Sequence, residues 1–556
     1  MRPLRGIMSR GKQAHNEKKT MWEQNYQPLM DSLGWSTAAA AVPILIPLLL
    51  IGVFRKPAWI AGLAGLVSAL VIAVGVYGMP VELAAESATM GAAFGLLPIG
   101  WIVYWAVVLF RITDETGNFA IIKDSIGGLT TDKRLQAMLI AFAFGAFIEG
   151  AAGFGTPVAV AAAMMIGLGF SPFFAAGICL LANTAPVAFG SIGVPVVTLA
   201  GTTGLSELEL SAWVGRLCAP ISLFIPAYLV LVMAGFRGLK GVWPAAMVCG
   251  VCFAGVQFLV SNYIGPQLVD ILAALTAMTG LVVLFRFWQP TDAFVLPGEH
   301  AATLAPQSHG LGRTVKGWSP YLFLVLFVLI WGFPATKAML ETTNLVFDWP
   351  GLHNQILRSA PMVDTPTPYG ARYTFNWLAA AGSACALATV AAALVLRVPV
   401  RTYFSVLGRV ARQLAFSLLT MACVLALAYV MNYSGATVTL GEAFAKTGVA
   451  FPFFSALLGW LGVFLTGSDT SANALFGNLQ VVTANSLGLN PAMMAASNSA
   501  GGVMGKMISL TSIAVAVAAT GMARSEEAKL FRFTVRHSVF LASVLGVLAT
   551  IYAYAF

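Results

Sequence analysis

Long apolar runs, separated by short polar loops, make up most of the chain. Each run is close to the roughly 20 residues that a helix needs to cross a bilayer, and the pattern continues from residue 35 to residue 554. Because only helices and closed barrels satisfy every backbone hydrogen bond in lipid, it predicts an all-α polytopic membrane protein with about 12–14 transmembrane helices. The expected spans are 35–53, 58–77, 90–110, 135–148, 212–234, 242–260, 268–285, 321–333, 375–396, 415–430, 449–464 and 539–554.

Two stretches, residues 147–195 and 465–512, interrupt this pattern without ceasing to be apolar. Both are rich in glycine and small polar residues, and the first also carries several prolines. Irregular backbone is tolerated at membrane depth only where protein buries it or where it lines a wet cavity. Interrupted helices around such a cavity are how secondary transporters bind solutes. The two stretches therefore predict broken or re-entrant hairpin regions that enclose a solute site.

Polar segments divide the chain into two membrane halves. The first 20 residues are polar and basic and lack the apolar core of a signal peptide, so a disordered tail is expected, with Met21 as an alternative start. The expected organisation is a basic tail (1–20), an N-terminal membrane half (21–286), a cytoplasmic loop (287–318) and a C-terminal membrane half (319–556) that includes an extracytoplasmic loop (336–374).

Basic residues concentrate in a few loops. They lie at Arg55, at Arg237 and in the segments 397–412 and 524–536, and the positive-inside rule places these loops in the cytoplasm. Counting spans from them puts the start of the chain outside the cell, whereas the basic tail favours the opposite side. For the orientation of the chain in the membrane, the internal loops count for more than the tail, because several of them indicate the same side.

The second half of the chain repeats the motif order of the first. The first copy covers about 91–234 and the second about 413–520, and the basic loops give the two copies opposite orientations. This predicts two inverted repeats, an arrangement that supports alternating access; the alternative is chance similarity between glycine-rich helices. The matching motifs are Gly117 and Gly435, FIEG at 147–150 and FLTG at 464–467, and GLGFSP at 167–172 and SLGLNP at 486–491.

Composition agrees with a membrane protein and excludes other classes. Of the 556 residues, 58% are hydrophobic and 10% are charged, against roughly 25% charged in soluble domains. The net charge of +9 does not indicate nucleic acid, because the basic residues lie in short loops. Cys249 and Cys252 are spaced C-x-x-C within an apolar run, which favours small buried side chains over a redox or metal site. No histidine falls within an expected span, so no metal, no catalytic residue and no cofactor beyond a coupling ion is expected.

Two carboxylates in the interrupted stretches are the candidates for proton coupling. Glu149 is surrounded by Ala, Gly and Phe, and Asp469 lies in the run GSDTSAN at 467–473. A carboxylate at membrane depth is costly and by default marks an ion or proton path. The alternative for Glu149 is a structural carboxylate with a backbone or basic partner, and the alternative for Asp469 is a loop that faces water.

Hydroxyl, amide and amine groups near these carboxylates are the candidates for solute binding. Hydroxyls and free N–H groups at a helix N-terminus suit a carboxylate ligand, and Lys506 could neutralise Asp469 or face an anion. The alternative for Lys506 is snorkelling to the interface, and polar residues beside proline have helix kinking as their alternative role. The candidates are Thr156, Asn183, Thr184, Ser468, Thr470, Ser471, Asn473, Asn498 and Lys506.

Several motifs resemble those of the bacterial L-lactate permease family. The resemblance covers nearly the whole chain from Met21. It implies a proton-coupled importer of L-lactate, often also of D-lactate and glycolate, in the bacterial cytoplasmic (inner) membrane, with inverted repeats and hairpins. It assigns no role to single residues. The motifs are MWEQNY at 21–26, FIEGAAGFGTP at 147–157, NTAPVAFG at 183–190, TGSDTSANALFGN at 466–478, GKMIS at 505–509 and LFRFTVRHS at 530–538.

The residues support a symporter of H⁺ and a small 2-hydroxy-monocarboxylate, with Glu149 and Asp469 as proton carriers. Ser, Thr and Asn beside Gly and Ala offer partners for a carboxylate and a hydroxyl in a small pocket. Cotransport of one proton avoids moving charge against the membrane potential. The alternatives are a Na⁺-coupled small-carboxylate transporter, a membrane-embedded enzyme and a passive channel. In the first of these, the cation would bind at two Asn-centred triplets, residues 182–184 (ANT) and 497–499 (SNS). The expected partners are the solute and the lipid bilayer, not nucleic acid, and the oligomeric state stays open.

Overall fold

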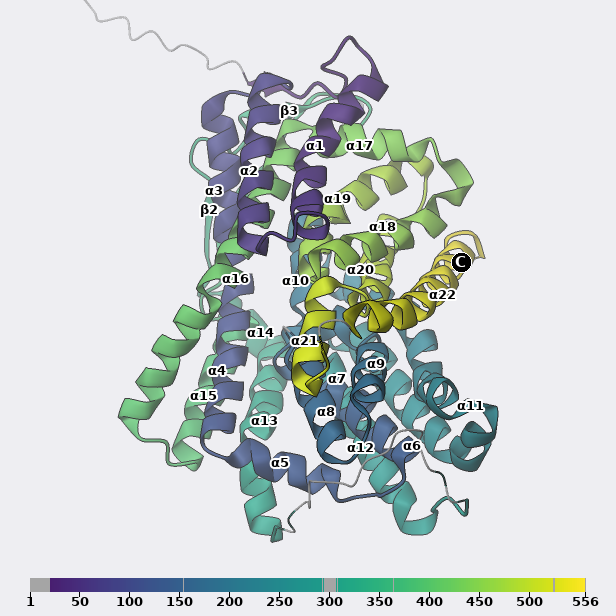
Figure 1. Ribbon diagram of the computed structural model, residues 1–556. Helices are drawn as coiled ribbons and strands as arrows, with labels where there is room; N and C mark the ends of the chain where they lie inside the picture. The colour runs from purple at the N-terminus through teal and green to yellow at the C-terminus, as the bar shows by residue number, and fades with distance from the viewer. Residues whose placement is uncertain are drawn as a thin grey trace, which may run out of the picture.

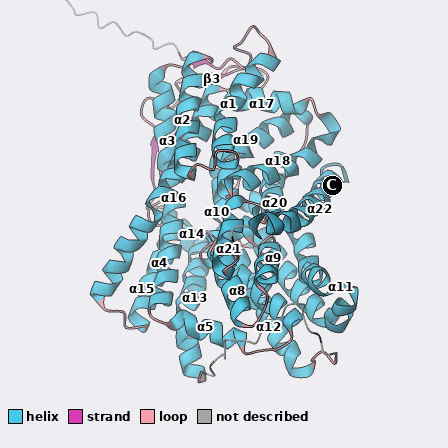
Figure 2. Ribbon diagram, viewed as in Figure 1, coloured by secondary structure: helices cyan, strands magenta, loops and turns pink. Residues whose placement is uncertain are grey.

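The computed structural model describes residues 21–153, 155–292, 294, 307, 309–363, 365–523 and 526–555. The expected disordered tail (1–20) lies outside these residues, as do residues 293, 295–306 and 308 of the expected cytoplasmic loop. Helices make up nearly all of the described chain, with a few short strands (Figure 2).

Helices in the first half of the chain are broken at several points inside the apolar stretches. Short 3₁₀ and π segments (η) mark some of these points. The segments are α1 (Leu33–Gly52), α2 (Ala58–Gly75), α3 (Val81–Phe94), η1 (Gly95–Gly100), α4 (Trp101–Glu115), α5 (Asn118–Gly127), α6 (Lys133–Gln136), η2 (Ala137–Phe144), α7 (Gly145–Ala151), α8 (Thr156–Gly167), α9 (Pro172–Ala182), η3 (Val187–Phe189), α10 (Gly190–Thr203), α11 (Glu207–Tyr263) and α12 (Val269–Phe287).

The second half contains further helices and, with residues near the start of the chain, two small sheets. The helices are α13 (Leu311–Gly332), α14 (Pro334–Glu341), α15 (Ala381–Val395), α16 (Val400–Ser434), α17 (Ala436–Ala445), η4 (Gly448–Ala450), α18 (Phe451–Thr466), α19 (Asp469–Leu487), α20 (Pro491–Lys506), α21 (Leu510–Thr520) and α22 (Glu527–Ala555). The strands are β1 (Trp22–Glu23), β2 (Leu345–Asp348), β3 (Ile356–Arg358), β4 (Thr367–Pro368) and β5 (Arg372–Phe375).

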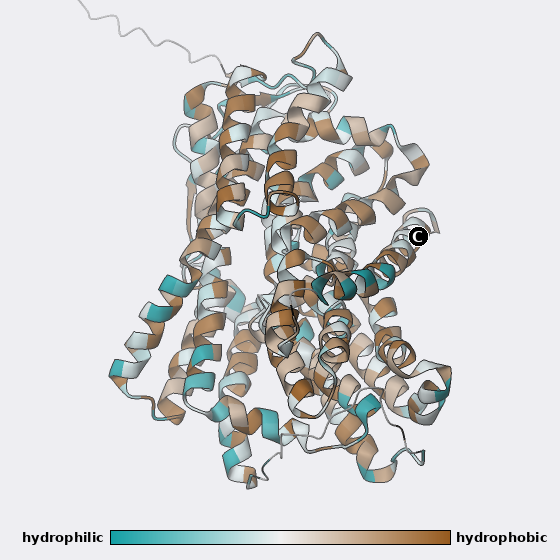
Figure 3. Ribbon diagram, viewed as in Figure 1, coloured by the Kyte–Doolittle hydropathy of each residue, from teal (hydrophilic) through white to brown (hydrophobic). Residues whose placement is uncertain are grey.

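Eleven helical segments of the described chain are long and apolar enough to cross a membrane. The number is twelve if the pair Pro172–Ala182 and Val187–Thr203, bent by 62°, forms one broken span. Much of the ribbon of α1 and α2 has the brown colour of hydrophobic residues (Figure 3), and Val67 and Val71 of α2 are 52% and 63% exposed. The all-α polytopic fold is therefore confirmed, the expected number of about 12–14 helices is met at its lower end, and the chain is a multi-pass membrane protein.

The longest polar segment, residues 336–374, holds most of α14 and most of both sheets. Strands β2 and β5 pair antiparallel, with Leu345 opposite Phe375. Strand β1 pairs parallel with β3, with Trp22 opposite Ile356, and β3 pairs antiparallel with β4. The start of the described chain is thus tied to a loop that follows it by more than 300 residues.

Gln24 anchors the same N-terminal segment to the end of α16. Its amide nitrogen donates to the carbonyl oxygens of Asn432 (3.0 Å) and Tyr433 (2.8 Å). The Tyr26 hydroxyl donates to the amide oxygen of Gln24 (2.9 Å). The last carbonyls of a helix have no partner within the helix, so Gln24 supplies donors that α16 itself cannot.

The expected basic loop at 397–412 is wrong in its extent. Helix α16 begins at Val400, so Arg401, Arg409 and Arg412 lie on the helix and only Arg397 lies in the loop. The polar first turns of α16 extend beyond its apolar part, and hydropathy alone cannot separate such turns from a loop. Arg237 likewise lies inside α11, beside a break at Gly235 (φ 66°).

The same order of elements occurs twice. In the first copy α4 leads through Gly117 to α5, then to a hairpin (α6–η2–α7 and α8) and to a broken pair, α9 and α10. In the second copy α16 leads through Gly435 to α17, then to the hairpin α18–α19 and to the broken pair α20 and α21. Figure 1 shows α5 at the bottom of the molecule and α17 at the top. Opposite placement is what inverted repeats require, and the inversion stays a prediction.

Each copy packs against the other at the centre of the molecule. Helix α8, the second arm of the first hairpin, lies against α21. Helix α19, the second arm of the second hairpin, lies against α10. In Figure 1, α10 and α21 occupy the middle of the molecule between the upper and lower helices. The two interrupted stretches of the sequence therefore meet.

Gly91 lets α3 lie directly against α16, and Gly91→Ala is expected to separate them. A Cβ at this position would lie 2.6 Å from the Leu425 carbonyl oxygen and 2.8 Å from the Ala426 Cα. Overpacking of this kind costs roughly 1–3 kcal/mol, so the thermal unfolding temperature in detergent should fall. Gly408→Ala in the same helix pair is the control, because a Cβ there meets nothing within 4 Å. Equal unfolding temperatures for both variants would contradict close contact at Gly91.

Candidate functional site

Two hairpin tips and two helix breaks meet at the centre of the structure. The first tip includes Gly153 (φ 56°) and Gly155 (φ 81°), left-handed conformations that favour glycine. The Ala152 carbonyl of this tip accepts a hydrogen bond from the Ser191 hydroxyl (3.1 Å), which lies at the break in the first turn of α10. The second tip turns through Gly467 (φ 72°) beside Thr511, in the first turn of α21. Each tip thus lies against the broken helix of its own copy.

The break within the first turn of α10 consists of three consecutive left-handed residues. Ser191, Ile192 and Gly193 have φ values of 48°, 60° and 75°. Non-glycine residues adopt this conformation only when the surrounding structure enforces it. Gly193 allows the break to lie close against the loop before α12, because a Cβ at this position would lie 2.8 Å from Pro266 in that loop. The break is therefore fixed from two sides, by the first tip and by the α11–α12 loop.

A cavity of about 280 Å³ lies between these breaks. It brings together Glu149, Asp469 and Lys506, which the sequence places in separate segments. Hydroxyl groups of both copies and of α16 share its wall. The lining residues are Ala58, Glu149, Gly155, Val187, Gly190, Ser191, Val194, Pro195, Ser417, Thr420, Met421, Thr466, Gly467, Ser468, Asp469, Thr470, Ser471, Lys506, Thr511, Ser512 and Val515.

Glu149, on α7, presents its carboxylate to this cavity and is otherwise buried (5% exposed). Gly190 makes room for it, because a Cβ there would lie 2.6 Å from the Glu149 Oε1 atom. Within the described chain the other oxygen, Oε2, has no hydrogen-bond partner. A buried carboxylate without full hydrogen bonding is costly, so Glu149 is suited to binding a proton or cation.

Asp469 is the first residue of α19 and is 3% exposed. Its Oδ2 atom accepts a hydrogen bond from the Ser499 hydroxyl (2.7 Å) on α20. Its Oδ1 atom has no partner among the residues that the structure describes. The N-terminus of a helix favours a negative charge, so α19 itself stabilises this carboxylate.

Lys506 ends α20 and lines the same cavity as the two carboxylates. Its ammonium group donates to the Gly467 carbonyl (2.6 Å) at the second tip. Its charge acts on both Glu149 and Asp469, although no ion pair within 4.0 Å joins them in the described chain. Lys506 therefore contributes a positive charge to the cavity that is not neutralised by a direct ion pair with either carboxylate.

The polar residues of the second tip complete one wall. Ser468 caps α19, accepting from the Ser471 amide (3.2 Å). Thr470 and Ser471 also line the cavity. Amide groups and hydroxyls at a helix N-terminus form a ready site for an anion. With Lys506 on the other side, this wall is suited to a carboxylate group.

Five of the nine predicted binding residues do not line this cavity: Asn473, Asn498, Asn183, Thr184 and Thr156. Asn473 and Asn498 are fully buried and hydrogen-bonded to each other (Nδ2 of Asn498 to Oδ1 of Asn473, 3.0 Å). Asn473 also donates to the Pro195 carbonyl (3.1 Å). These amides join α19 and α20 to α10. Asn183 and Thr184 lie at the break after α9, buried, with side-chain polar atoms that have no partner in the described residues.

Thr156 lines a second, larger hollow of about 910 Å³. This hollow lies between α4, α5, α8 and α21, toward the α5 end of the molecule. It shares Gly155 and Val515 with the first cavity. Because the two linings share only Gly155 and Val515, these residues lie at the boundary between the inner cavity and the outer hollow.

The base of the first hairpin is held by a buried arginine. The Arg134 guanidinium, with a fully buried side chain, donates to Asp132 (2.7 Å), to Asp292 (2.6 Å) and to the Gly238 carbonyl (3.1 Å). Its hydrogen bonds lower the pKa of the Asp292 carboxyl below the ordinary value. This anchor ties the hairpin to α11 and to the residues after α12.

The sequence analysis missed Asp270 and the hydroxyls of α16. Asp270 lies in the first turn of α12, is 1% exposed, and the negative charge of Glu149 disfavours its ionised form. Ser417 and Thr420 of α16 line the cavity. The sequence could have indicated Asp270 as a site residue, because it is a carboxylate inside the expected span 268–285. It could not have indicated Ser417 and Thr420, since hydroxyls are common in membrane helices.

Comparison with known proteins gives a consistent result over the chain. The profile of a family described as L-lactate permease matches residues 36–556. The chain is 46% identical to the L-lactate permease of Bacillus subtilis (strain 168) over 96% of this chain and 99% of that protein. It is 43% identical to the glycolate permease GlcA of Escherichia coli (strain K12) over 96% and 98%. The Alcanivorax borkumensis YdaH transporter structure is similar with a TM-score of 0.45 and 14% identity, covering 94% of this chain and 97% of that one.

Proposed function

The chain belongs to the L-lactate permease family, and from this premise we propose that it imports L-lactate by proton symport across the bacterial cytoplasmic membrane. D-lactate and glycolate are the proposed further substrates, and the solute crosses chemically unchanged. Glycolate is included because a relative with 43% identity is a glycolate permease. The observation that carries the proposal is the cavity in which Glu149, Asp469 and Lys506 meet beside the N-terminus of α19.

The cavity suits a small hydroxy-acid anion in size and chemistry. A volume of about 280 Å³ corresponds to roughly nine water molecules of the liquid. Lys506 and the amides and hydroxyls of residues 468–471 form the anion-binding wall. Hydroxyls of α16 and α21 lie around it and can pair with a substrate hydroxyl, while Val187 and Val194 accept an apolar methyl group.

The charges around the cavity support the proposed proton coupling. A bound anion adds a negative charge to a site where Glu149 and Asp469 already outnumber Lys506. Burying an uncompensated charge is costly, so anion and proton bind together more favourably than either alone. Transport of the pair is electrically neutral and avoids about 2.3 kcal/mol per charge for each 100 mV of membrane potential. The larger hollow is the proposed route by which solute and proton pass between the cavity and the α5 end of the molecule.

The test is uptake of labelled L-lactate into vesicles that contain the purified protein. An inward proton gradient is expected to drive accumulation above the external concentration, and a proton-conducting ionophore is expected to abolish it. Glycolate and D-lactate should compete, and an unlabelled internal pool should support counterflow, which excludes a channel.

A second candidate function is Na⁺-coupled uptake, favoured by the unpartnered oxygens of Asn183 and Thr184. The same vesicles distinguish the two functions. Accumulation that needs a sodium gradient and ignores the proton gradient would establish the second function and remove the first.

A further inference from the structure

Asp270 is a buried carboxylate that no polar group of the described chain satisfies. It is the second residue of α12 and is 1% exposed, and neither carboxylate oxygen has a hydrogen-bond partner among those residues. A carboxylate in this state costs several kcal/mol unless it binds a proton or a cation. Such a group at membrane depth is a functional candidate by default.

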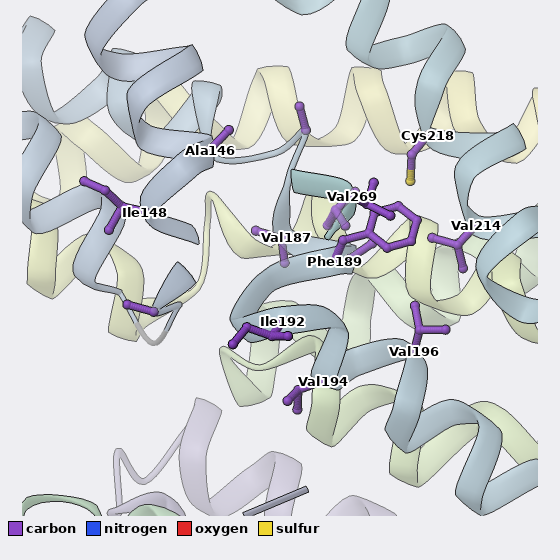
Figure 4. Packing of buried hydrophobic residues seen from close by; sticks show 14 of the residues in the cluster. Ala146, Ile148, Val187, Phe189, Ile192, Val194, Val196, Val214, Cys218 and Val269 are labelled. Carbon is purple, nitrogen blue, oxygen red and sulfur yellow. The ribbon is translucent and has the colours of Figure 1, made fainter. Parts of the chain in front are cut away.

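Asp270 lies against the helix that carries Glu149. A Cβ at Gly150 would lie 2.7 Å from the Asp270 Cβ and 3.1 Å from the Ile271 amide nitrogen. Only glycine therefore allows the start of α12 to approach α7 so closely. The two carboxylates act on each other electrostatically. Figure 4 shows Val269, the residue before Asp270, in the apolar cluster with Val187 and Phe189 next to the cavity wall.

Among the described residues, no positively charged group is found to act on Asp270. Helix α12 packs against α7, α10, α11 and η2. From these elements, the titratable groups that act on Asp270 or are acted on by it are Glu149 of α7 and Cys218 of α11; α10 and η2 have none in their sequence. Lys506 acts on Glu149 and Asp469. Within the described chain, the Lys506 ammonium group is thus the single positive charge for three carboxylates, those of Glu149, Asp469 and Asp270. The excess negative charge has to be neutralised by bound protons or cations.

An independent observation comes from the two Asn-centred triplets. In the second copy, Asn498 and its neighbour Ser499 are hydrogen-bonded to Asn473 and Asp469. In the first copy, Asn183 lies against the Glu149 carboxylate, yet both its amide atoms lack a properly oriented partner in the described chain. Next to this break, the Gln257 amide donates to the Ala185 carbonyl (3.2 Å), while its oxygen has no partner in the same set of residues. The Asn498 and Ser499 side chains of the second copy are thus hydrogen-bonded, whereas the Asn183 and Thr184 side chains of the first copy, beside Glu149, have unpartnered polar atoms within the described chain.

We propose that Asp270 is a third carboxylate of the coupling site and exchanges the transported proton with Glu149. The inference rests on the proposed proton symport. When a proton passes from Asp270 to Glu149, the O–H bond on Asp270 breaks, one forms on Glu149, and the negative charge moves to Asp270. Asp270 is not among the residues that line the 280 Å³ cavity, so it acts as a proton relay through Glu149 and not as a substrate ligand.

Asp270→Asn separates the two roles when two activities are measured in the same vesicles. Accumulation driven by the proton gradient is expected to fall by roughly 100-fold, the scale of a lost proton-transfer group. Counterflow of lactate at equal pH should fall only a few-fold, since solute binding stays. Asp270→Glu should restore part of the gradient-driven uptake. Full gradient-driven uptake by Asp270→Asn, or equal loss of both activities in a folded variant, would overturn the proposal.

Gly150→Ala gives a second test that leaves every carboxylate in place. The added methyl group would push α12 from α7 and lower gradient-driven uptake more than counterflow. Gly145→Ala on the same helix is the control, because its nearest contact is an ordinary 3.6 Å, and it should behave as the wild type. If the wild type ignores the proton gradient, the proposed function fails. If the wild type follows it and both Asp270→Asn and Gly150→Ala do too, only the relay fails.

Discussion

Glu149→Gln is expected to abolish the accumulation of lactate that an inward proton gradient drives. Glutamine keeps the size and polarity of the side chain but cannot bind and release a proton. The loss should reach roughly 100-fold or more, since an acid–base group at its place contributes about that factor. Lactate binding should persist, because Lys506 and the second tip are unchanged, so that counterflow at equal pH remains measurable.

The control for Glu149→Gln is Glu442→Gln. Glu442 lies on α17 and accepts a hydrogen bond from the Ser486 hydroxyl (2.6 Å), far from the residues that line the cavity. This variant should take up lactate as the wild type does. Full gradient-driven uptake by Glu149→Gln would remove Glu149 from the proton path.

Lys506→Met is expected to weaken lactate binding strongly. The ammonium group is the positive charge that acts on both cavity carboxylates, and methionine keeps only the apolar stem. Loss of one partner from a buried, hydrogen-bonded charge arrangement costs about 2–5 kcal/mol, so the half-saturating lactate concentration should rise at least about 30-fold. Lys506→Arg, which keeps the charge, should fall between wild type and Lys506→Met.

Equilibrium binding and uptake together test this role of Lys506. Lactate should stabilise the purified wild type against heat and should not stabilise Lys506→Met at the same concentration. Lys446→Met, an exposed change after α17, is the control and should keep both properties. Unchanged affinity in Lys506→Met would mean that its ammonium group serves the hairpin tip alone, through the Gly467 carbonyl.

The polar residues that stand alone in apolar sequence were the most predictable part of the site. Glu149, Asp469 and Lys506 stand out because lipid penalises charge, and the structure brings all three to one cavity. Their roles in coupling and binding stay predictions. The membrane fold was predictable for the same reason, since backbone hydrogen bonding in lipid leaves few choices.

Contacts between distant helices were not predictable. Nothing near Asn473 indicates that its amide donates to Pro195, 278 positions earlier, so an amide in a packed interface and an amide in a pocket look the same in sequence. Asp270 is visible in the sequence as a carboxylate inside the expected span 268–285, but its position beside α7 depends on a loop that returns to the centre of the molecule and was therefore not predictable.

The packing of α8 against α21 has a consequence for biosynthesis. Leu510 follows Thr156 by 354 positions, and a ribosome that adds 5–20 residues per second needs roughly 20–70 s to reach it. During that interval the first hairpin is inserted while the helix that covers it does not yet exist. The face of the first hairpin that packs against α21 in the folded protein is therefore uncovered during this interval. An insertase or a neighbouring helix has to cover that face until translation ends.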